Sequence, residues 1–216
     1  MKTPLDILDG LTADTCEAKY QLFYPACQAA EFAADETAVR VEGIFHASAD
    51  AVVKSYCFLV LGAIVDSGQL SDEATQRTTR FLETELNSLT EFALKDEKGR
   101  YIHYLSHMAY LAGSLQKYND ITPIYEALFC AYLRADEQIC GNEDVVIAEV
   151  LLGAADVANM LARLMRQVGE PSPPVIPEAN KKALWLAMFA LNGRLKKHDP
   201  ALFVPLVDDL VAMVQD

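Results

Sequence analysis

Apolar residues recur along this chain at the three- and four-residue spacing of α-helices. Tyr20, Phe23 and Cys27 follow this spacing, which places them on one face of a helix. Pro25 lies inside the same window, residues 14–34, and is expected to kink or divide the helix because it cannot donate a backbone hydrogen bond. No segment alternates apolar and polar residues in the manner of a half-buried strand.

Cap and turn residues divide the chain into successive helices. Asp35 and Glu36 open one of them, since carboxylates are favourable at a helix N-terminus, and Ser71 is placed to cap another. After a short start at residues 5–8, the expected helices span residues 14–34, 35–46, 49–66, 72–98, 100–118, 121–138, 143–168, 178–196 and 200–214. The sequence therefore predicts an all-α fold, with eight or nine helices in an irregular multi-helical bundle or a short α-solenoid-like stack.

One proline-rich stretch marks a boundary in the chain. Residues 169–177 contain four prolines in nine positions, a composition that favours extended backbone. We expect a main helical domain over residues 1–168, this linker, and a C-terminal helical pair over 178–216 that packs on the main domain.

The chain is strongly acidic, and the acidity is unevenly distributed. Its 216 residues contain 31 acids and 18 bases, a formal net charge of −13. Residues 1–150 hold 24 acids and 11 bases, whereas residues 151–216 hold seven of each. A negative surface repels phosphate groups, so we expect neither a nucleic acid nor a membrane as partner.

Cysteine usage and hydropathy indicate the compartment. The five cysteines are widely spaced and form no CxxC pair, so neither a disulfide framework nor a zinc site is expected. The longest apolar run, residues 56–65, is half the length needed to span a bilayer and is expected to be a buried core segment. The first residues carry no apolar signal sequence. These features predict a reduced, cytoplasmic protein.

Arg100, His103 and His107 form a candidate catalytic set. The two histidines are four residues apart and Arg100 lies seven residues before His107, so the three share a helix face. This spacing resembles the Arg-x(4–6)-His motif of the helical HEPN nucleases, although Tyr101 stands where that family has a polar residue. The resemblance covers one helix and implies a metal-independent ribonuclease, with histidine transferring protons and arginine stabilising the phosphorane.

Other catalytic and ligand-binding templates are not matched. No Asp or Glu stands three residues before any histidine, so we expect no metal site of the helical di-iron type, and no nucleotide-binding or hydrolase glycine motif occurs. Residues 66–73 do not fit a calcium loop. This eight-residue string resembles the inter-helix turn of TerB-type tellurite-resistance proteins and is interpreted as a turn. We expect no cofactor.

Tyrosines and carboxylates are concentrated in the second half of the acidic region. Six of the nine tyrosines fall within residues 101–132, and tyrosine is enriched at protein interfaces. Some of these acids also have helix-capping reasons for their positions. The predicted partner-binding surface comprises Tyr118, Asp120, Tyr125, Glu126, Tyr132, Asp136, Glu137, Glu143 and Asp144.

Three functions are compatible with these patterns. The first is a non-enzymatic cytoplasmic protein that binds and neutralises or regulates a basic protein, for example an immunity or antitoxin-type inhibitor of a nuclease toxin. The second is a metal-independent, RNase-like enzyme that uses Arg100, His103 and His107. The third is a regulatory module that binds a small ligand in a hollow between helices. The sequence leaves the partner and the oligomeric state open.

Overall fold

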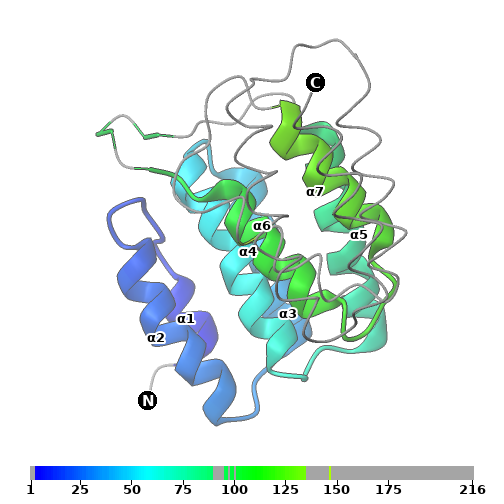
Figure 1. Ribbon diagram of the computed structural model, residues 1–216. Helices are drawn as coiled ribbons and strands as arrows, with labels where there is room; N and C mark the ends of the chain where they lie inside the picture. Colours follow the sequence, from blue (N-terminus) through cyan, green and yellow to red (C-terminus); the bar gives the residue numbers. More distant parts are fainter. Residues whose placement is uncertain (1–2, 90–94, 97, 100, 135–145, 147–216) are drawn as a thin grey trace, which may run out of the picture.

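The computed structural model describes residues 3–89, 95–96, 98–99, 101–134 and 146. Seven helices lie in this part of the chain (Figure 1), and within it no strand forms. They are α1 (Pro4–Leu8), α2 (Cys16–Ala29), α3 (Ala34–Ala47), α4 (Ala51–Asp66), α5 (Asp72–Ser88), α6 (Tyr104–Leu115) and α7 (Thr122–Arg134). The all-α prediction is confirmed, and the helices expected at 143–168, 178–196 and 200–214 lie outside the described residues.

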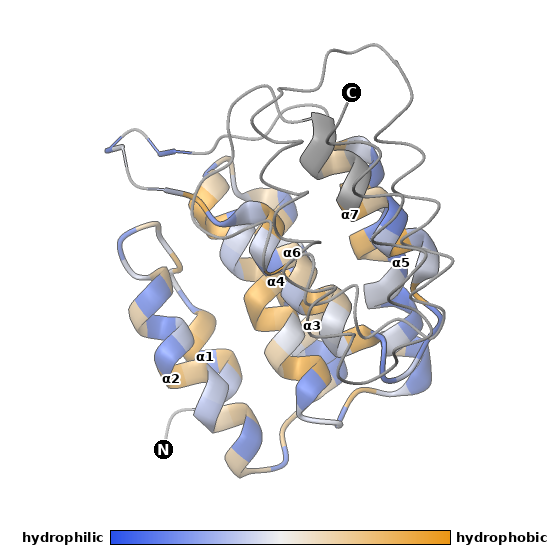
Figure 2. Ribbon diagram, in the orientation of Figure 1, coloured by the Kyte–Doolittle hydropathy of each residue, from blue (hydrophilic) through white to orange (hydrophobic). Residues whose placement is uncertain are grey.

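Helix α4 is the centre of the bundle. It packs against α2, α3 and α6, while α5 packs against α7 on the other side of α6 (Figure 1). Eleven of its sixteen residues are buried, and Figure 2 shows hydrophobic positions concentrated along it. The apolar run at residues 56–65 is therefore a core helix, as its length predicted. None of the seven helices combines the length and hydropathy of a bilayer-spanning segment.

Local chemistry explains where several helices begin. Ser71 is the N-cap of α5, and its side chain accepts a hydrogen bond from the Ala74 amide at 3.2 Å. Asp50 caps α4 in the same way through the Val52 amide at 2.9 Å. Helix α2 continues through Pro25 without being divided.

The expected helix over residues 100–118 begins later than its apolar pattern predicted. Gly99 has a φ of +77°, and its amide donates to the Asp96 carbonyl at 2.9 Å. This turn brings Tyr101 back beside Lys95, with which it forms an isolated antiparallel bridge. The described residues between Lys95 and His103 thus precede the helix, and α6 begins at Tyr104.

Close packing between α4 and α6 depends on Gly62. A β-carbon at this position would lie 2.5 Å from Cε1 and 2.7 Å from Cδ1 of Tyr110. The tyrosine ring cannot move freely, because its hydroxyl donates to Asp66 Oδ2 at 2.8 Å. The absence of a side chain at residue 62 therefore sets the distance between the two helices.

We expect Gly62→Ala to lower the free energy of unfolding by about 1–3 kcal/mol, because overpacking outweighs the gain of ~1 kcal/mol in helix propensity. Chemical denaturation followed by circular dichroism measures this change. Gly43→Ala is the matched control, since Gly43 lies within α3 and a β-carbon added there would have no neighbour within 4 Å. The control should stabilise the protein by about 0.5–1 kcal/mol, and a stabilising Gly62→Ala would contradict the packing argument.

Candidate functional site

The two candidate catalytic histidines lie together at the start of α6. His103 is exposed at the N-cap position and His107 is half-buried in the first turns. Their ring centroids are 6.1 Å apart, so they share a face as the sequence predicted. Arg100 lies outside the described residues. The described part of the chain contains no group of three or more His, Cys, Asp or Glu side chains placed to hold a metal ion.

His107 connects α6 to α4 through a polar contact. Its Nδ1 lies 2.7 Å from Ser55 Oγ, and its ring meets the ring of Tyr56 edge-on at 5.2 Å between centroids. The Tyr56 hydroxyl in turn donates to Glu17 Oε2 on α2. The hydrogen bonds from Tyr56 and Gln21 lower the pKa of Glu17, so this carboxylate stays ionised and holds the tyrosine.

This environment limits the chemistry available to His107. Burial lowers its pKa to about 4, which makes it a neutral and weakly basic imidazole at neutral pH. Its partner Ser55 is only 1% exposed, so the serine oxygen has no access to a substrate. The pair acts as a hydrogen-bonded joint between two core helices.

Six aromatic rings form a continuous row from α2 across α4 to the start of α6. Neighbouring ring centroids are separated by 4.9 to 6.4 Å. In order along the row they are Tyr24, Tyr20, Tyr56, His107, His103 and Tyr101. The sequence interpretation missed the first three, although the four-residue spacing of Tyr20 and Tyr24 was a signal that they share a face. The row therefore links α2 to α6 through Tyr56 of α4.

The predicted tyrosine-rich surface is only partly present on the described surface. Tyr118 is 51% exposed, Glu126 is half-buried, and Asp120 is exposed and accepts hydrogen bonds from the Thr122 amide at 3.0 Å and hydroxyl at 2.7 Å. Tyr125 is 1% exposed and its hydroxyl donates to Gln116. Its assignment to the surface was wrong, because its position in α7 faces the core.

Five members of the predicted surface have no described side chain. Tyr132 lies within α7, but its side chain falls outside the description. Asp136, Glu137, Glu143 and Asp144 also lie outside the described residues. The location of these groups relative to Tyr118 and Asp120 stays a prediction.

A second acidic surface, which the sequence did not predict as a unit, lies where α3 and α5 begin. We call it the acidic end. Five exposed carboxylates form it: Glu31, Asp35, Glu36, Asp72 and Glu73. Residues 20–39 and 55–76, which contain all five and also Asp66, include no lysine or arginine. Asp66 is neutralised by Lys117 at 2.9 Å.

Long-range hydrogen bonds join the two loops of the acidic end. Asp35 accepts from the Ser71 amide at 3.0 Å and the Ser71 hydroxyl at 2.6 Å, and these bonds lower the pKa of Asp35. Gln69 donates to the Ala30 carbonyl at 3.2 Å and accepts from the Phe32 amide at 3.1 Å. The two helix N-termini are thereby held side by side, and their dipoles favour the carboxylates there.

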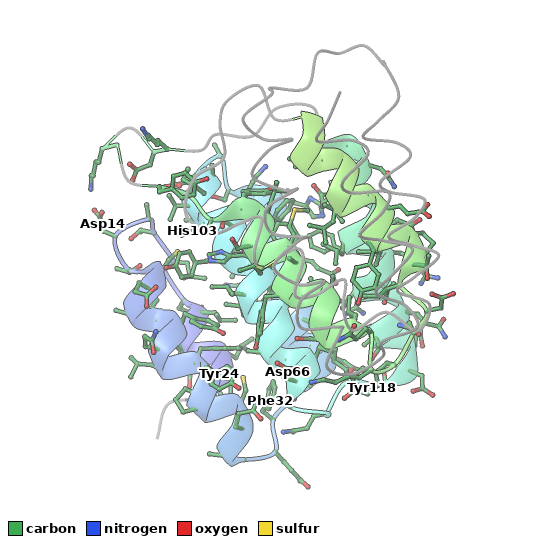
Figure 3. The ribbon with its side chains drawn as sticks, viewed as in Figure 1. Asp14, Tyr24, Phe32, Asp66, His103 and Tyr118 are labelled. Carbon is green, nitrogen blue, oxygen red and sulfur yellow. The ribbon has the colours of Figure 1, made fainter. Side chains whose placement is uncertain are left out.

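Aromatic side chains border the acidic end. Figure 3 shows Tyr24, Phe32, Asp66 and Tyr118 at the same end of the molecule, away from Asp14 and His103. Tyr24 and Tyr118 are 40% and 51% exposed. A hollow of about 450 Å³ opens between the two loops. Its lining residues are Ala33, Ala34, Asp35, Glu36, Gln69, Leu70 and Ser71.

A larger cleft of about 590 Å³ lies at the opposite end of α4. It is formed by the loop before α2, the start of α4, and Lys95, Asp96, Lys98 and Ile102. Both signs of charge line it, and Lys98 Nζ is 2.7 Å from Asp14 Oδ1. These opposite charges satisfy each other and do not single out one ligand.

Compared with known proteins, the chain matches no family model, no curated protein and no solved structure.

Proposed function

We propose that this protein is a non-enzymatic, cytoplasmic binding protein that docks a basic protein partner on its acidic end. An immunity or antitoxin-type inhibitor that covers the positive cleft of a nuclease toxin is a concrete form of this function. One observation carries the proposal: five exposed carboxylates meet at the beginnings of α3 and α5, within segments that contain no lysine or arginine.

The chemistry of the acidic end supports a protein as the partner. Opposite potentials accelerate encounter and select the partner, while exposed aromatics supply contact area at small entropic cost. Tyr24, Phe32 and Tyr118 lie at the same end of the molecule as Asp66, the last residue of α4 (Figure 3), and the hollow between the loops can receive one long basic side chain. Tyr118 belongs both to this group and to the surface proposed from the sequence.

In our proposal, the rest of the chain adds further helices to the seven described above. We propose eight or nine helices, not counting the five-residue α1, in an irregular bundle. Helix α4 packs on three neighbours, whereas the units of a solenoid contact only the preceding and following ones. Residues 1–168 form the main domain, 169–177 a linker and 178–216 a helical pair packed on that domain. The carboxylates of residues 136–144 supply further contacts to the partner.

Neutralising the acidic end tests the proposal. We expect Glu31→Gln/Glu36→Gln/Glu73→Gln to weaken binding of the basic partner about tenfold, at ~0.5 kcal/mol for each exposed charge pair. Candidate partners are the basic proteins encoded beside this chain, and calorimetry from 50 to 300 mM salt gives the dissociation constant. These three side chains make no cap, unlike Asp35, so the variant loses only the favourable interaction of Glu36 and Glu73 with their helix dipoles, about 0.3–1 kcal/mol each.

A second triple variant with the same change in net charge is the control. Asp9→Asn/Asp14→Asn/Glu83→Gln alters exposed or half-exposed carboxylates away from the acidic end, and should weaken binding less than threefold. Equal losses in the two variants would show that only net charge matters. Tight binding that ignores salt would contradict the electrostatic proposal.

The small-ligand function is the second candidate, and the cleft of about 590 Å³ favours it. A ligand bound there would raise the melting temperature, and above Kd the increase would grow with the logarithm of the ligand concentration. Thermal shift screening against charged metabolites, with Lys98→Ala as the cleft variant, tests this function separately from the acidic end.

A further inference from the structure

Asp66 carries its charge at an unfavourable place in the fold. It is the last residue of α4, and the carbonyl groups at the C-terminal end of a helix repel a carboxylate and attract cations. Its side chain is only 17% exposed, so water screens the charge poorly. Oδ2 of the carboxylate accepts a hydrogen bond from the Tyr110 hydroxyl at 2.8 Å. A cation at Oδ1 therefore stabilises this residue.

Lys117 supplies that cation from the turn that follows α6. Its Nζ donates to Asp66 Oδ1 at 2.9 Å, and within the described residues the ammonium group makes no other hydrogen bond. The lysine side chain is 58% exposed, although the carboxylate that it contacts is mostly buried. An ion pair whose cation is exposed contributes little to stability. Another cation can therefore replace Lys117 on Asp66 at small cost.

Two exposed tyrosines stand beside this ion pair. Tyr118 follows Lys117 in the chain, and its hydroxyl donates to the carbonyl of Val65 at 3.4 Å. Tyr24 and Tyr118 both act electrostatically on the charge of Lys117. Both tyrosines also lie at the same end of the molecule as Asp66 (Figure 3). Since tyrosine rings attract cations through their π-electrons, the surroundings of Asp66 offer an incoming cation an aromatic surface as well as a negative charge.

The combination of a carboxylate and tyrosine rings favours arginine as the incoming cation. A guanidinium group is planar and presents five N–H donors, so it can bind a carboxylate and stack on an aromatic ring at the same time. An ammonium group is a compact point charge, which suits the carboxylate but does not stack. An arginine placed on Asp66 therefore makes contacts that Lys117 cannot make.

This site is continuous with the acidic end. Residues 67–70 connect Asp66 to the N-cap of α5, and Gln69 within this connection is hydrogen-bonded to the loop before α3. Residues 55–76 contain no lysine or arginine, and Lys117 lies 51 positions along the chain from Asp66. A cation from a distant turn thus occupies the edge of the surface on which a basic partner is proposed to dock.

We propose that Lys117 holds the place of an arginine side chain of the basic partner, and that this arginine displaces Lys117 from Asp66 when the partner docks. The inference rests on the proposed function, because the partner is the protein that binds the acidic end, and it names the side chain by which that protein is anchored. Displacement also contributes to selectivity. A basic protein without an arginine at this position gains too little to replace Lys117 and binds more weakly.

Calorimetric titration of the full chain with tetra-arginine and tetra-lysine peptide amides in 0.1 M salt tests the displacement. We expect Lys117→Gln to bind tetra-arginine about fivefold more tightly than the wild type, because Asp66 is then free to accept a guanidinium. Tetra-lysine should gain only about twofold, since its ammonium groups do not stack on tyrosine. Asp66→Asn in the Lys117→Gln background should abolish both gains.

Lys98→Gln is the matched control. Lys98 is 61% exposed, its Nζ lies 2.7 Å from Asp14 Oδ1, and its replacement changes the net charge by the same amount. It borders the cleft at the opposite end of α4, and charges more than ~10 Å apart are largely screened in this salt, so its affinities should stay within about 1.5-fold of the wild type. Lys117→Arg keeps the ion pair and should show no gain. Circular dichroism verifies that each variant is folded.

Three results would overturn the displacement. They are a Lys117→Gln variant that binds tetra-arginine no more tightly than the wild type, an equal gain in Lys98→Gln, and an equal gain for the two peptides. The triple variant Glu31→Gln/Glu36→Gln/Glu73→Gln separates this inference from the proposed function. If the triple variant weakens peptide binding while Lys117→Gln has no effect, the acidic end binds basic partners without displacing Lys117. If the triple variant has no effect while Lys117→Gln gains affinity, Asp66 is the arginine site and the acidic end is not the docking surface.

A peptide that binds none of these proteins would overturn both.

Discussion

Replacing Phe58 with alanine is expected to lower the free energy of unfolding by about 3–5 kcal/mol, the upper end of the range for a single core substitution. Phe58 is fully buried in α4. Its ring contacts Phe45 of α3, Phe81 of α5 and Tyr104 of α6, with centroid distances of 5.3, 5.9 and 5.5 Å. The alanine would leave a cavity among four helices that cannot all move inward together.

The conservative variant Phe58→Leu separates cavity formation from loss of the aromatic ring. It retains most of the side-chain volume, so we expect a loss of about 1–1.5 kcal/mol. Urea unfolding followed by circular dichroism at 15 °C gives both values, provided that the slope with denaturant is unchanged. A loss below 1 kcal/mol for the alanine variant would show that Phe58 is not the junction of these helices.

Helix periodicity predicted the core well because burial follows spacing along a helix. The apolar run at 56–65 became the central helix α4. The same rule, applied to α7, would have placed Tyr125 correctly. It lies four residues after Ile121 and three before Leu128, both of which are buried. The density of tyrosines in residues 101–132 suggested a surface, but position on the helix decides which of them are exposed.

The acidic end is a feature that the sequence alone predicted only in part. Asp35, Glu36, Asp72 and Glu73 each have a local reason to stand at a helix N-terminus, and the sequence predicted that much. These carboxylates lie close together because hydrogen bonds join residues that are 36 or more positions apart in the sequence. The bonds run from Ser71 to Asp35 and between Gln69 and the loop before α3. No spacing rule along the chain encodes such a pairing.

Residues 95–103 show a different limit. The spacing of Arg100, His103 and His107 fits one helix face, but the turn at Asp96 and Gly99 delays the start of α6 to Tyr104. His103 therefore lies at the helix boundary, as the N-cap of α6, two residues after the bridge between Lys95 and Tyr101. The Asp-Glu-Lys-Gly string was a turn signal, and it outweighed the helical spacing that followed it.

Stability should fall as the pH decreases from about 6.5 to 4, because His107 is neutral in the folded protein. Burial lowers its pKa from 6.5 to about 4, so in this range the unfolded chain binds a proton that the folded chain does not. The unfolded state is therefore favoured progressively, by up to about 3 kcal/mol at pH 4. Urea unfolding at half-unit pH intervals measures the loss.

The variant His107→Gln isolates this contribution. Glutamine can keep a hydrogen bond to Ser55 but does not titrate, and the other three histidines are present in both proteins. Stability of the variant should consequently depend less steeply on pH between 6.5 and 4.5, where carboxylates of the unfolded chain are still largely ionised. Parallel stability curves for the two proteins would contradict the prediction.

The midpoint of the His107 imidazole, followed by NMR, also separates the binding function from the enzymatic alternative. A general base for chemistry at neutral pH needs a pKa near 7, and a ribonuclease built on His107 would show one. A titration midpoint near pH 4 corresponds to an imidazole that is buried between α4 and α6, where it is hydrogen-bonded to Ser55 and packed against Tyr56. The enzymatic interpretation would then have to depend on His103, which is exposed. Its neighbour His107 would be too weakly basic to assist it.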